Sequence, residues 1–435
     1  MRILFLNDLS DPRIGSSIRQ MYQEARVLRA LGHETALVTA TQDASQATPP
    51  TEPIDIEGMR VWRLHSDYNV RFRGWVALDN RRVRAGFADV LREFRPDVVH
   101  SHLVHTHIGY GALTAANRAG AGVVFTAHDV MTFCYQKLTC FHGGEARDGA
   151  LRDYSAYWQK CIPCQRFRYN PWRNAAIRRV LANDVHRLTV VSDELGTVLR
   201  ANRIRVDRTV YNALALQERH VAPEVVAEFR RRFGLTGMRV IAIGGRLHEQ
   251  KGVAQLLRML ARLAPEFADL RLIVMGKRDV YDRDFLALAR ELGVEGRVVP
   301  TGWLDGTDLR AAYAATDVFV TPSICFDTFG LVNLEAMEHE KPVVATVFGG
   351  SPEVVVDGET GFVANPFDIE SFADKIRRLL LDPALRERMG RAGARRLVEK
   401  FTIERLTKEF LDEYESAREL AAQERTSGSR RLSSK

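Results

Sequence analysis

Two carboxylates around a glycine turn are the residues of this chain best placed to do chemistry. Asp327 and Glu335 lie eight residues apart, and Gly330 permits a sharp entry into a helix that begins near Leu331. The first amides of such a helix, including that of Val332, can hold a phosphate. Glu335, one turn into the helix, can accept hydrogen bonds from two adjacent hydroxyls such as those of a ribose. The segment therefore predicts a nucleotide pocket.

A second glycine-rich segment supplies positive charge. The run GGRLHEQKG, residues 244–252, follows a predicted strand, and doubly wound folds bind ligands at the carboxyl ends of their strands. Arg246 offers a planar fork to two phosphate oxygens, and Lys251 offers a compact charge. Such cations stabilise a departing diphosphate most strongly in the transition state. The alternative is an ordinary pair of surface cations at the end of a strand.

Both segments resemble the signature of the retaining GT-B glycosyltransferases of family 4. In that family two acids bracket a Phe-Gly turn, and a Pro-Val-Val-Ala strand, a Gly-Gly turn and Pro-Glu-Val follow, as in residues 342–345, 349–350 and 352–354 here. The run at 244–252 is similar to the family's Gly-Arg-Leu and Lys-Gly pair. The family has Glu where this chain has Asp327, which is one methylene shorter.

The resemblance implies roles for these residues. Arg246 and Lys251 would hold the diphosphate of a sugar nucleotide, Asp327 would contact the donor sugar, and Glu335 would bind the ribose. Backbone groups near the strand ends, around Gly302 and Trp303, would recognise the base.

The first half of the chain carries weaker signals of the same kind. Gly15 and Ser16 follow the first predicted strand and match a family loop that touches the donor phosphate. His128 ends a strand and corresponds to a family histidine beside the donor sugar, although a lone histidine is more often structural. His100 and His102 either line the acceptor side or belong to the core.

The reaction that the resemblance implies is retaining transfer of a sugar to a hydroxyl acceptor. No divalent cation is required, because cationic side chains take its place at the diphosphate. A UDP-sugar is the first choice of donor and a GDP-sugar the second. A GT-B sugar-nucleotide epimerase and a non-catalytic, zinc-bearing basic binding module are the alternatives.

Alternating strands and helices in two blocks predict an α/β fold. The first block predicts a helix over residues 14–31 and strands at 2–7, 35–39, 61–64, 98–100, 123–127, 188–192 and 209–211. The second block predicts strands at 239–244, 270–275, 297–300, 317–320 and 342–345. Two Rossmann-like, doubly wound parallel-sheet domains facing across a cleft make the GT-B architecture.

The domain boundary is expected near Asn212. An acceptor-side domain over 1–212 would then precede a nucleotide-sugar-binding domain over 213–403. A helix over 404–423 would pack back on the first domain, and the tail, 425–435, lacks an apolar face and is expected to be disordered.

Four cysteines fall within a predicted insertion of the first domain, residues 130–170. Cys134, Cys140, Cys161 and Cys164 form the pattern C-x5-C-x20-C-x2-C, whose spacing suits a tetrahedral structural zinc. Free thiols are the alternative, and disulfides fit a cytoplasmic protein poorly. Cys325 stands apart and reads as a small core residue.

The net charge of +7 is concentrated in part of the first domain. Residues 151–212 carry 12 Lys and Arg against 5 Asp and Glu, and the run 166–187 interleaves aromatic residues with arginines. The basic run has three interpretations: a solvated basic face, a peripheral contact with an anionic membrane, or a site for an anionic acceptor or nucleic acid. No nucleic-acid-binding motif accompanies the run, so no nucleic-acid partner is expected.

The composition fits a soluble globular protein of two or three domains. The chain has 435 residues, of which 46% are hydrophobic and 27% charged. Its first apolar run is too short for a signal peptide, and no stretch approaches the length of a membrane span. A cytoplasmic location, with a peripheral contact on the inner membrane face as its variant, is therefore expected.

Overall fold

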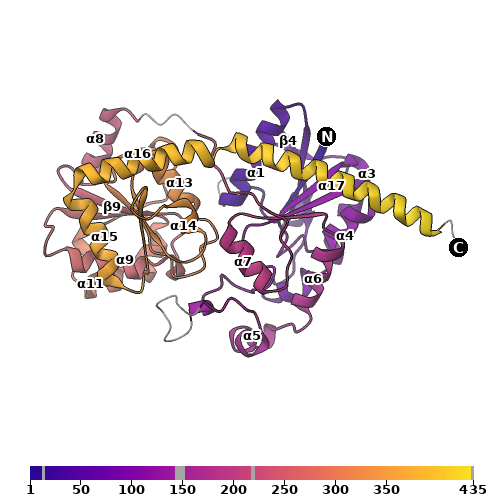
Figure 1. The fold of residues 1–435 in the computed structure, drawn as a ribbon, viewed down its shortest axis with the longest axis horizontal. Coiled ribbons are helices and arrows are strands. Elements are labelled where there is room, and N and C mark those ends of the chain that lie inside the picture. The colour runs from indigo at the N-terminus through magenta and orange to yellow at the C-terminus, as the bar shows by residue number, and fades with distance from the viewer. Residues whose placement is uncertain (12–14, 143–151, 217–220, 433–435) are drawn as a thin grey trace. The chain divides into compact units, whose positions relative to one another are not determined.

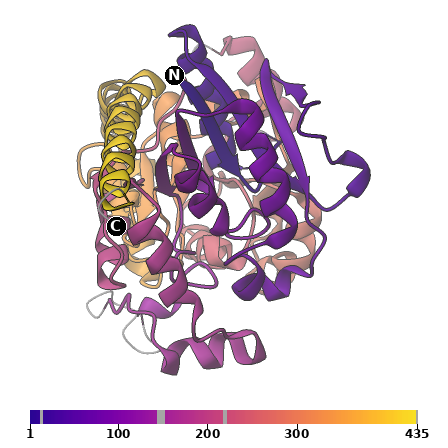
Figure 2. The ribbon, with the colours of Figure 1, turned by 90° about the vertical axis from the view of Figure 1, so that its right-hand side faces the viewer.

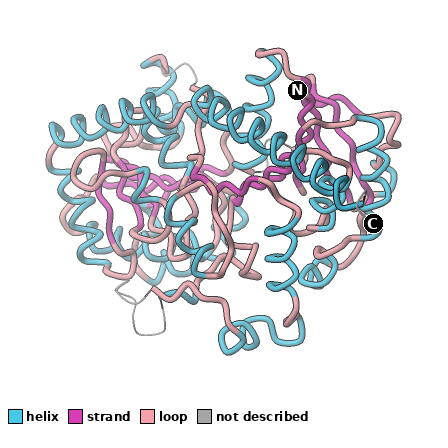
Figure 3. Tube along the Cα trace, turned by 45° about the vertical axis from the view of Figure 1, so that its right-hand side comes forward, coloured by secondary structure: helices cyan, strands magenta, loops and turns pink. Residues whose placement is uncertain are grey.

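A computed structural model describes residues 1–11, 15–142, 152–216 and 221–432 of the chain. It divides into two compact units, which we describe separately. The first comprises Met1–Leu138, Tyr154–Asn212 and Ile403–Lys435, and the second comprises Thr139–Asp153 and Ala213–Thr402. Helices lie on both sides of the sheet in each unit (Figure 3).

The first unit is built on an eight-stranded sheet in the order β3-β4-β2-β1-β5-β6-β7-β8. Its strands are β1 (Arg2–Asn7), β2 (Glu34–Thr41), β3 (Ile54–Ile56), β4 (Met59–His65), β5 (Val98–Leu103), β6 (Gly122–Ala127), β7 (Arg187–Val190) and β8 (Arg208–Thr209). All neighbours pair in parallel except β3 and β4. The central strands are buried apolar runs, as parallel strands covered on both faces must be.

Eight α-helices belong to the described part of this unit. They are α1 (Ser16–Ala30), α2 (Arg73–Val76), α3 (Arg81–Phe94), α4 (Gly111–Arg118), α5 (Trp158–Gln165), α6 (Arg173–Asn183), α7 (Asp193–Ala201) and α17 (Ile403–Leu432). The α1 helix packs against α17, and α3 packs against α4. Figure 2 shows α17, in yellow, running along this unit, and it contacts β5, β6 and β7.

The second unit has a six-stranded, wholly parallel sheet in the order β11-β10-β9-β12-β13-β14. Its strands are β9 (Arg239–Gly244), β10 (Leu270–Met275), β11 (Val298–Gly302), β12 (Val318–Thr321), β13 (Val343–Thr346) and β14 (Gly361–Ala364). Its helices are α8 (Pro223–Arg232), α9 (Val253–Leu263), α10 (Arg278–Asp284), α11 (Leu286–Glu291), α12 (Gly306–Ala315), α13 (Leu331–Glu338), α14 (Ser351–Val354), α15 (Ile369–Leu381) and α16 (Pro383–Lys400). Figure 1 labels most of them. Apolar side chains of α9 and α15 pack on the sheet in one continuous core.

The structure differs from the sequence expectations at two segments. The expected insertion is divided, because Thr139–Asp153 groups with the second unit. The last helix also continues to Leu432, whereas the composition predicted a disordered tail from residue 425. Contacts with the segments that precede β7 and β6 explain part of this extension, since Glu424 pairs with His186 at 3.5 Å and Arg425 donates to the Gly120 carbonyl.

Candidate active site

The loop after β9 carries the two predicted cations at the carboxyl edge of the second sheet. Gly245 reverses the chain there with a φ of 102°, and its amide donates to the Met275 carbonyl at the end of β10 at 3.0 Å. A Cβ on Gly252 would lie 1.8 Å from the Pro322 carbonyl oxygen, so the loop can close against the end of β12 only with glycine. These turns place Arg246 and Lys251 beside the ends of β9 and β12.

Lys251 and Asp327 form an ion pair at this edge. The Lys251 ammonium donates to Oδ2 of Asp327 at 2.9 Å, and the Ser323 hydroxyl donates to the same oxygen at 3.0 Å. Burial alone would lower the pKa of Lys251, but the Asp327 carboxylate outweighs it, so that the pKa of Lys251 lies above its ordinary value. The lysine therefore remains a cation, oriented by an acid that is buried itself.

The second glycine turn of the motif packs against Asp327. Gly349 pairs with Asp327 in a parallel bridge, and a Cβ on Gly349 would lie 2.1 Å from the Asp327 carbonyl oxygen. The Gly350 amide donates to that carbonyl at 2.7 Å. The Gly-Gly turn thus fixes the backbone that carries the acid.

The α13 helix begins beside the cation loop. Gly330 precedes it with a φ of 79° and leaves its first amides without a side-chain cap. A Cβ on Gly245 would lie 3.6 Å from Cγ1 of Val332, so the Gly245 turn and the start of α13 are neighbours. The buried Asn333 accepts a hydrogen bond from the Thr321 hydroxyl at 2.9 Å, which ties the helix to β12.

Glu335 lies half-buried on α13, where it accepts a hydrogen bond from the Tyr313 hydroxyl at 2.7 Å. Gly302 ends β11 with a φ of 82°, and Trp303 beside it is 54% exposed. Because all six strands are parallel, these two residues lie at the same edge of the sheet as Gly244. The structure therefore gathers every predicted nucleotide-binding residue of the second half at one edge.

The Thr139–Asp153 segment adds an aromatic contact that the sequence did not indicate. The buried Phe141 ring packs edge-on against Phe348 and Phe326, with centroids 5.2 and 6.3 Å away. Arg152 donates to the Val347 carbonyl at 3.2 Å, and its guanidinium lies 5.8 Å from the Phe348 ring centroid. Both contacts flank the backbone of Asp327 and Gly349.

His128 belongs to a histidine cluster at the carboxyl edge of the first sheet. Its Nε2 lies 2.7 Å from Nδ1 of His102, and the two rings stack with centroids 5.0 Å apart. Burial lowers the pKa of His128 to about 4, so the ring is neutral at neutral pH. His105 pairs with Asp129 at 3.2 Å in the same cluster. Because His102 lies in β5 while His105 and His128 lie in the loops after β5 and β6, sequence spacing did not predict the cluster.

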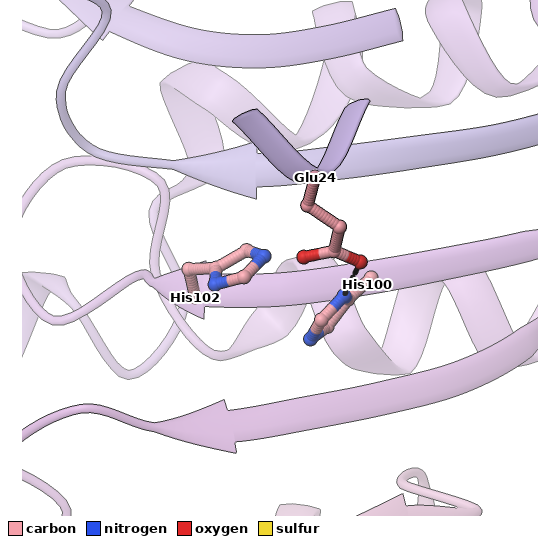
Figure 4. A group of neighbouring side chains, drawn as sticks. All are labelled: Glu24, His100 and His102. Atoms are coloured by element: carbon pink, nitrogen blue, oxygen red, sulfur yellow. Dashed lines mark ion pairs between the residues drawn. The ribbon is translucent and has the colours of Figure 1, made fainter. Parts of the chain in front are cut away.

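Glu24, His100 and His102 lie together in a buried polar group (Figure 4). Tyr414 of α17 donates to Glu24 of α1, and the same hydroxyl lies 2.7 Å from Nδ1 of His100. Nε2 of His100 lies 2.7 Å from the Thr126 hydroxyl. Glu24, His100 and His102 can supply three metal-ligand atoms within 4.8 Å, but both nitrogens of His100 already have hydrogen-bonding partners. We therefore interpret the group as a hydrogen-bonded network.

The other predicted residues of the first unit are placed as follows. Gly15 has extended backbone and precedes α1, which Ser16 begins, while residues 12–14 lie outside the described part. Cys134 and Cys161 are half-buried, whereas Cys140 and Cys164 are exposed. Among the described residues, no three of these sulfurs lie within 4.8 Å of one another. The phosphate contact and the zinc site both stay predictions.

Two family profiles match the chain in tandem. Glycosyltransferase Family 4 matches residues 19–218, and Glycosyl transferases group 1 matches residues 226–396. The second match contains the whole Arg246–Glu335 site.

Curated relatives are similar over different shares of the chain. A GDP-mannose-dependent phosphatidylinositol monomannoside mannosyltransferase of Mycolicibacterium smegmatis is 34% identical over 177 residues, 39% of this chain and 46% of the relative. The glycogen synthase of Mycobacterium tuberculosis is 26% identical over 415 residues, 92% and 91% of the two chains. The chain spans about half the length of several of its curated relatives.

Solved structures share the whole fold. The Anabaena protein HepE, in complex with UDP and glucose, matches with a TM-score of 0.69 and 18% identity over 96% of this chain and all of that one. Sucrose-phosphate synthase from Thermosynechococcus elongatus matches with a TM-score of 0.73. The two parallel-sheet units have the GT-B fold that we expected. With two family matches in tandem and this fold, the chain belongs to the family 4, group 1 glycosyltransferases.

Proposed function

We propose that this glycosyltransferase moves a sugar from a nucleotide diphosphate sugar to a hydroxyl acceptor, with retention of anomeric configuration and without a divalent cation. The observation that carries the proposal is the Lys251–Asp327 pair at the carboxyl edge of the second sheet, 2.9 Å long and beside the exposed Arg246. Two cations next to an uncapped helix start match the charge of a diphosphate.

The two cations would act on the leaving group. Breaking the bond between the sugar and the phosphate leaves negative charge on the departing diphosphate. A lysine that Asp327 and the surrounding turns already hold in place can stabilise that charge without reorganisation. In this proposal Arg246 and Lys251 supply the positive charge that a metal ion supplies in other transferases.

Donor recognition would use the rest of the same edge. The amides of Gly330, Leu331 and Val332 would bind phosphate oxygens, and Glu335 would accept hydrogen bonds from the ribose. Backbone groups at Gly302 and Trp303 would contact the base. The UDP bound to HepE favours a UDP-sugar as donor, and the mannosyltransferase that uses GDP-mannose keeps a GDP-sugar as the second choice.

The first unit would contribute the acceptor side and His128. A neutral imidazole can donate or accept one hydrogen bond at a sugar hydroxyl, and its partner His102 restricts which nitrogen carries the proton. We infer that His128 contacts the donor sugar in this way, as a neutral group.

Nucleotide release tests the proposal against its alternatives. The purified chain is incubated with UDP-glucose, UDP-N-acetylglucosamine, UDP-galactose and GDP-mannose, and free nucleotide diphosphate and the remaining sugar nucleotide are both quantified. A transferase releases diphosphate from at least one donor, through transfer or slow hydrolysis. An epimerase converts the sugar without release, and a zinc-bearing binding module does neither. Either of those two results would overturn the proposal.

Two other expectations remain proposals beside the reaction. The four cysteines would hold a structural zinc, and a basic surface of the first unit would contact an anionic membrane on its cytoplasmic face. In the described part of the chain, no helix combines the length and the apolar character needed to cross a bilayer.

A further inference from the structure

Exposed large hydrophobic side chains are concentrated in two short segments of the first unit. Thirteen such side chains are exposed among the described residues, and eight of them fall within residues 70–75 and 157–172. The eight are Val70, Phe72, Trp75, Tyr157, Trp158, Ile162, Phe167 and Trp172. Phe167 and Trp172 are 79% and 72% exposed, the highest values of the thirteen. Scattered exposed apolar residues are ordinary, but a concentration of this kind marks an interaction site.

The two segments are bound together by buried polar groups. Asn170 donates from its side chain to the Gly74 carbonyl at 2.9 Å. The Tyr135 hydroxyl donates to the Asn170 carbonyl at 2.9 Å and accepts from the Asn170 amide at 3.1 Å. The Arg173 guanidinium stacks 4.5 Å from the centroid of the Tyr135 ring. Asn170, Tyr135 and Gly74 are buried, so the contacts that join the two segments lie beneath the exposed aromatic residues and do not include them.

Positive charge accompanies the exposed residues. Residues 68–76 contain Arg71 and Arg73, and residues 154–172 contain Lys160, Arg166 and Arg168, while neither stretch contains an acidic residue. Together they carry a charge of +5, from two and three cations. Figure 1 shows the second stretch, with α5, at the edge of the first unit and away from its sheet.

We propose that these two segments, the aromatic–basic surface, dock on an anionic lipid bilayer. Tryptophan and phenylalanine side chains insert at the boundary between headgroups and acyl chains, and lysine and arginine bind the anionic headgroups. Charge complementarity selects this partner, because a protein partner of ordinary composition would not require five cations with no acid among them. The inference does not depend on the transfer reaction proposed above, since docking is measured without any sugar donor.

Vesicle co-sedimentation of the full chain tests the proposal. Vesicles of phosphatidylcholine alone are compared with vesicles that also contain phosphatidylglycerol, at low and at high salt. We expect the protein to pellet with the anionic vesicles at low salt, to be released by high salt, and to stay in the supernatant with the neutral ones. A folded protein that stays in the supernatant throughout, or pellets equally with both vesicles, overturns the proposal.

Paired variants assign the binding to this surface. Phe167→Ser and Trp172→Ser should each weaken binding several-fold, whereas Leu31→Ser, at a 59% exposed position elsewhere in the first unit, should leave it unchanged. Arg166→Glu should weaken binding about fivefold or more, and Arg388→Glu on α16 should not. Thermal unfolding checks that each variant is folded. Equal binding by the surface variants and their controls would overturn the assignment of binding to this surface. Self-association that Phe167→Ser abolishes would assign the surface to a second copy of the chain instead.

Discussion

The two acids of the candidate site, Asp327 and Glu335, have different hydrogen-bonding partners. Asp327 accepts hydrogen bonds from both the Lys251 ammonium and the Ser323 hydroxyl on one oxygen, while Glu335 accepts one from the Tyr313 hydroxyl. The two acids of the motif therefore differ in their surroundings as well as in their distance from the helix start. Substitution at one should affect the reaction differently from substitution at the other.

The first prediction separates these two acids. Asp327→Glu moves the carboxylate outward by one methylene, so relative activity among donor sugars should change while nucleotide affinity stays within about threefold. Glu335→Ala should weaken binding of every donor, by about tenfold or more, because a carboxylate shared by two hydroxyls is lost. Calorimetry with UDP and initial rates with the donor panel measure both effects.

Tyr313→Phe is the matched control for the second acid. It removes only the hydroxyl that orients Glu335, so its effect on nucleotide affinity should be smaller than that of Glu335→Ala. An unchanged donor ranking in a folded Asp327→Glu protein would remove the sugar contact from our account of that residue.

The second prediction concerns the buried Glu24. Burial raises its pKa from an ordinary value of 4.5 to about 8, so the folded chain holds this proton over a range where the unfolded chain has released it. Stability from this group is complete below about pH 4.5 and is lost as the pH rises toward 8, by about 1.4 kcal/mol per pH unit. The free energy of unfolding of the wild type should therefore fall by on the order of 2–3 kcal/mol between pH 6 and 8 through Glu24 alone.

Glu24→Gln tests this directly, because glutamine resembles the protonated acid and cannot titrate. Urea unfolding at pH 6 and pH 8 should show a smaller loss in the variant. The neighbouring His100 and His102, whose pKa values burial lowers, act in the opposite direction and only as the pH falls below about 6.5. Equal losses in wild type and variant over this range would rule out the raised pKa.

Helices and strands position these side chains, and most of the helices and strands could be predicted from the sequence. The strands at 2–7, 239–244 and 270–275 are predicted to the residue because each contains a short apolar run, with a charged or polar residue only near its ends. The short strands Ile54–Ile56 and Gly361–Ala364 were missed, since three or four residues carry too little pattern to stand out. The motif residues were identified from the sequence. The ion pair between Lys251 and Asp327 was not, because the two residues are 76 positions apart and only the fold brings them together.

The third prediction concerns the close contact between β6 and α17. A Cβ on Gly122 would lie 2.8 Å from backbone atoms of Ala417 and Arg418. Gly122→Ala should therefore push the helix off the strand and destabilise the first unit by about 1–3 kcal/mol. Gly296→Ala is the control, because nothing lies within 4 Å of a Cβ there. Thermal unfolding should show a lower midpoint for Gly122→Ala only, and equal midpoints would contradict the tight contact.

The fourth prediction concerns the cysteine segment. If Cys134, Cys140, Cys161 and Cys164 hold a structural zinc, protein purified without added metal should contain about one zinc per chain. Cys161→Ser should lose it and make the surrounding residues more sensitive to protease. Cys325→Ser, outside the pattern, should keep the metal. Four titratable thiols in metal-free protein with full activity would reject the zinc.

The whole molecule combines two parallel-sheet units in the GT-B fold, and the chemistry of the second is the better defined. Its predicted cations, helix start and acid all lie at one sheet edge, as the parallel strands require. The histidine cluster of the first unit could not be predicted in the same way, because it joins His102 of β5 to His105 and His128 in the loops after β5 and β6, and their contacts depend on loop conformation. The aromatic–basic surface could not be predicted either, because the sequence does not show which of its aromatic residues are buried, as Tyr135 is, and which are exposed, as Phe167 is.

The fifth prediction concerns the leaving-group site, on which the whole account rests. Release of UDP from UDP-sugars is measured for wild type, Lys251→Ala and Lys400→Ala, an exposed lysine on α16 that serves as the control. We predict release by wild type and Lys400→Ala, and a rate about 10²-fold lower for Lys251→Ala at an unchanged fold, because the charge on the departing diphosphate loses its oriented cation. Release by folded Lys251→Ala at the wild-type rate would contradict the central claim.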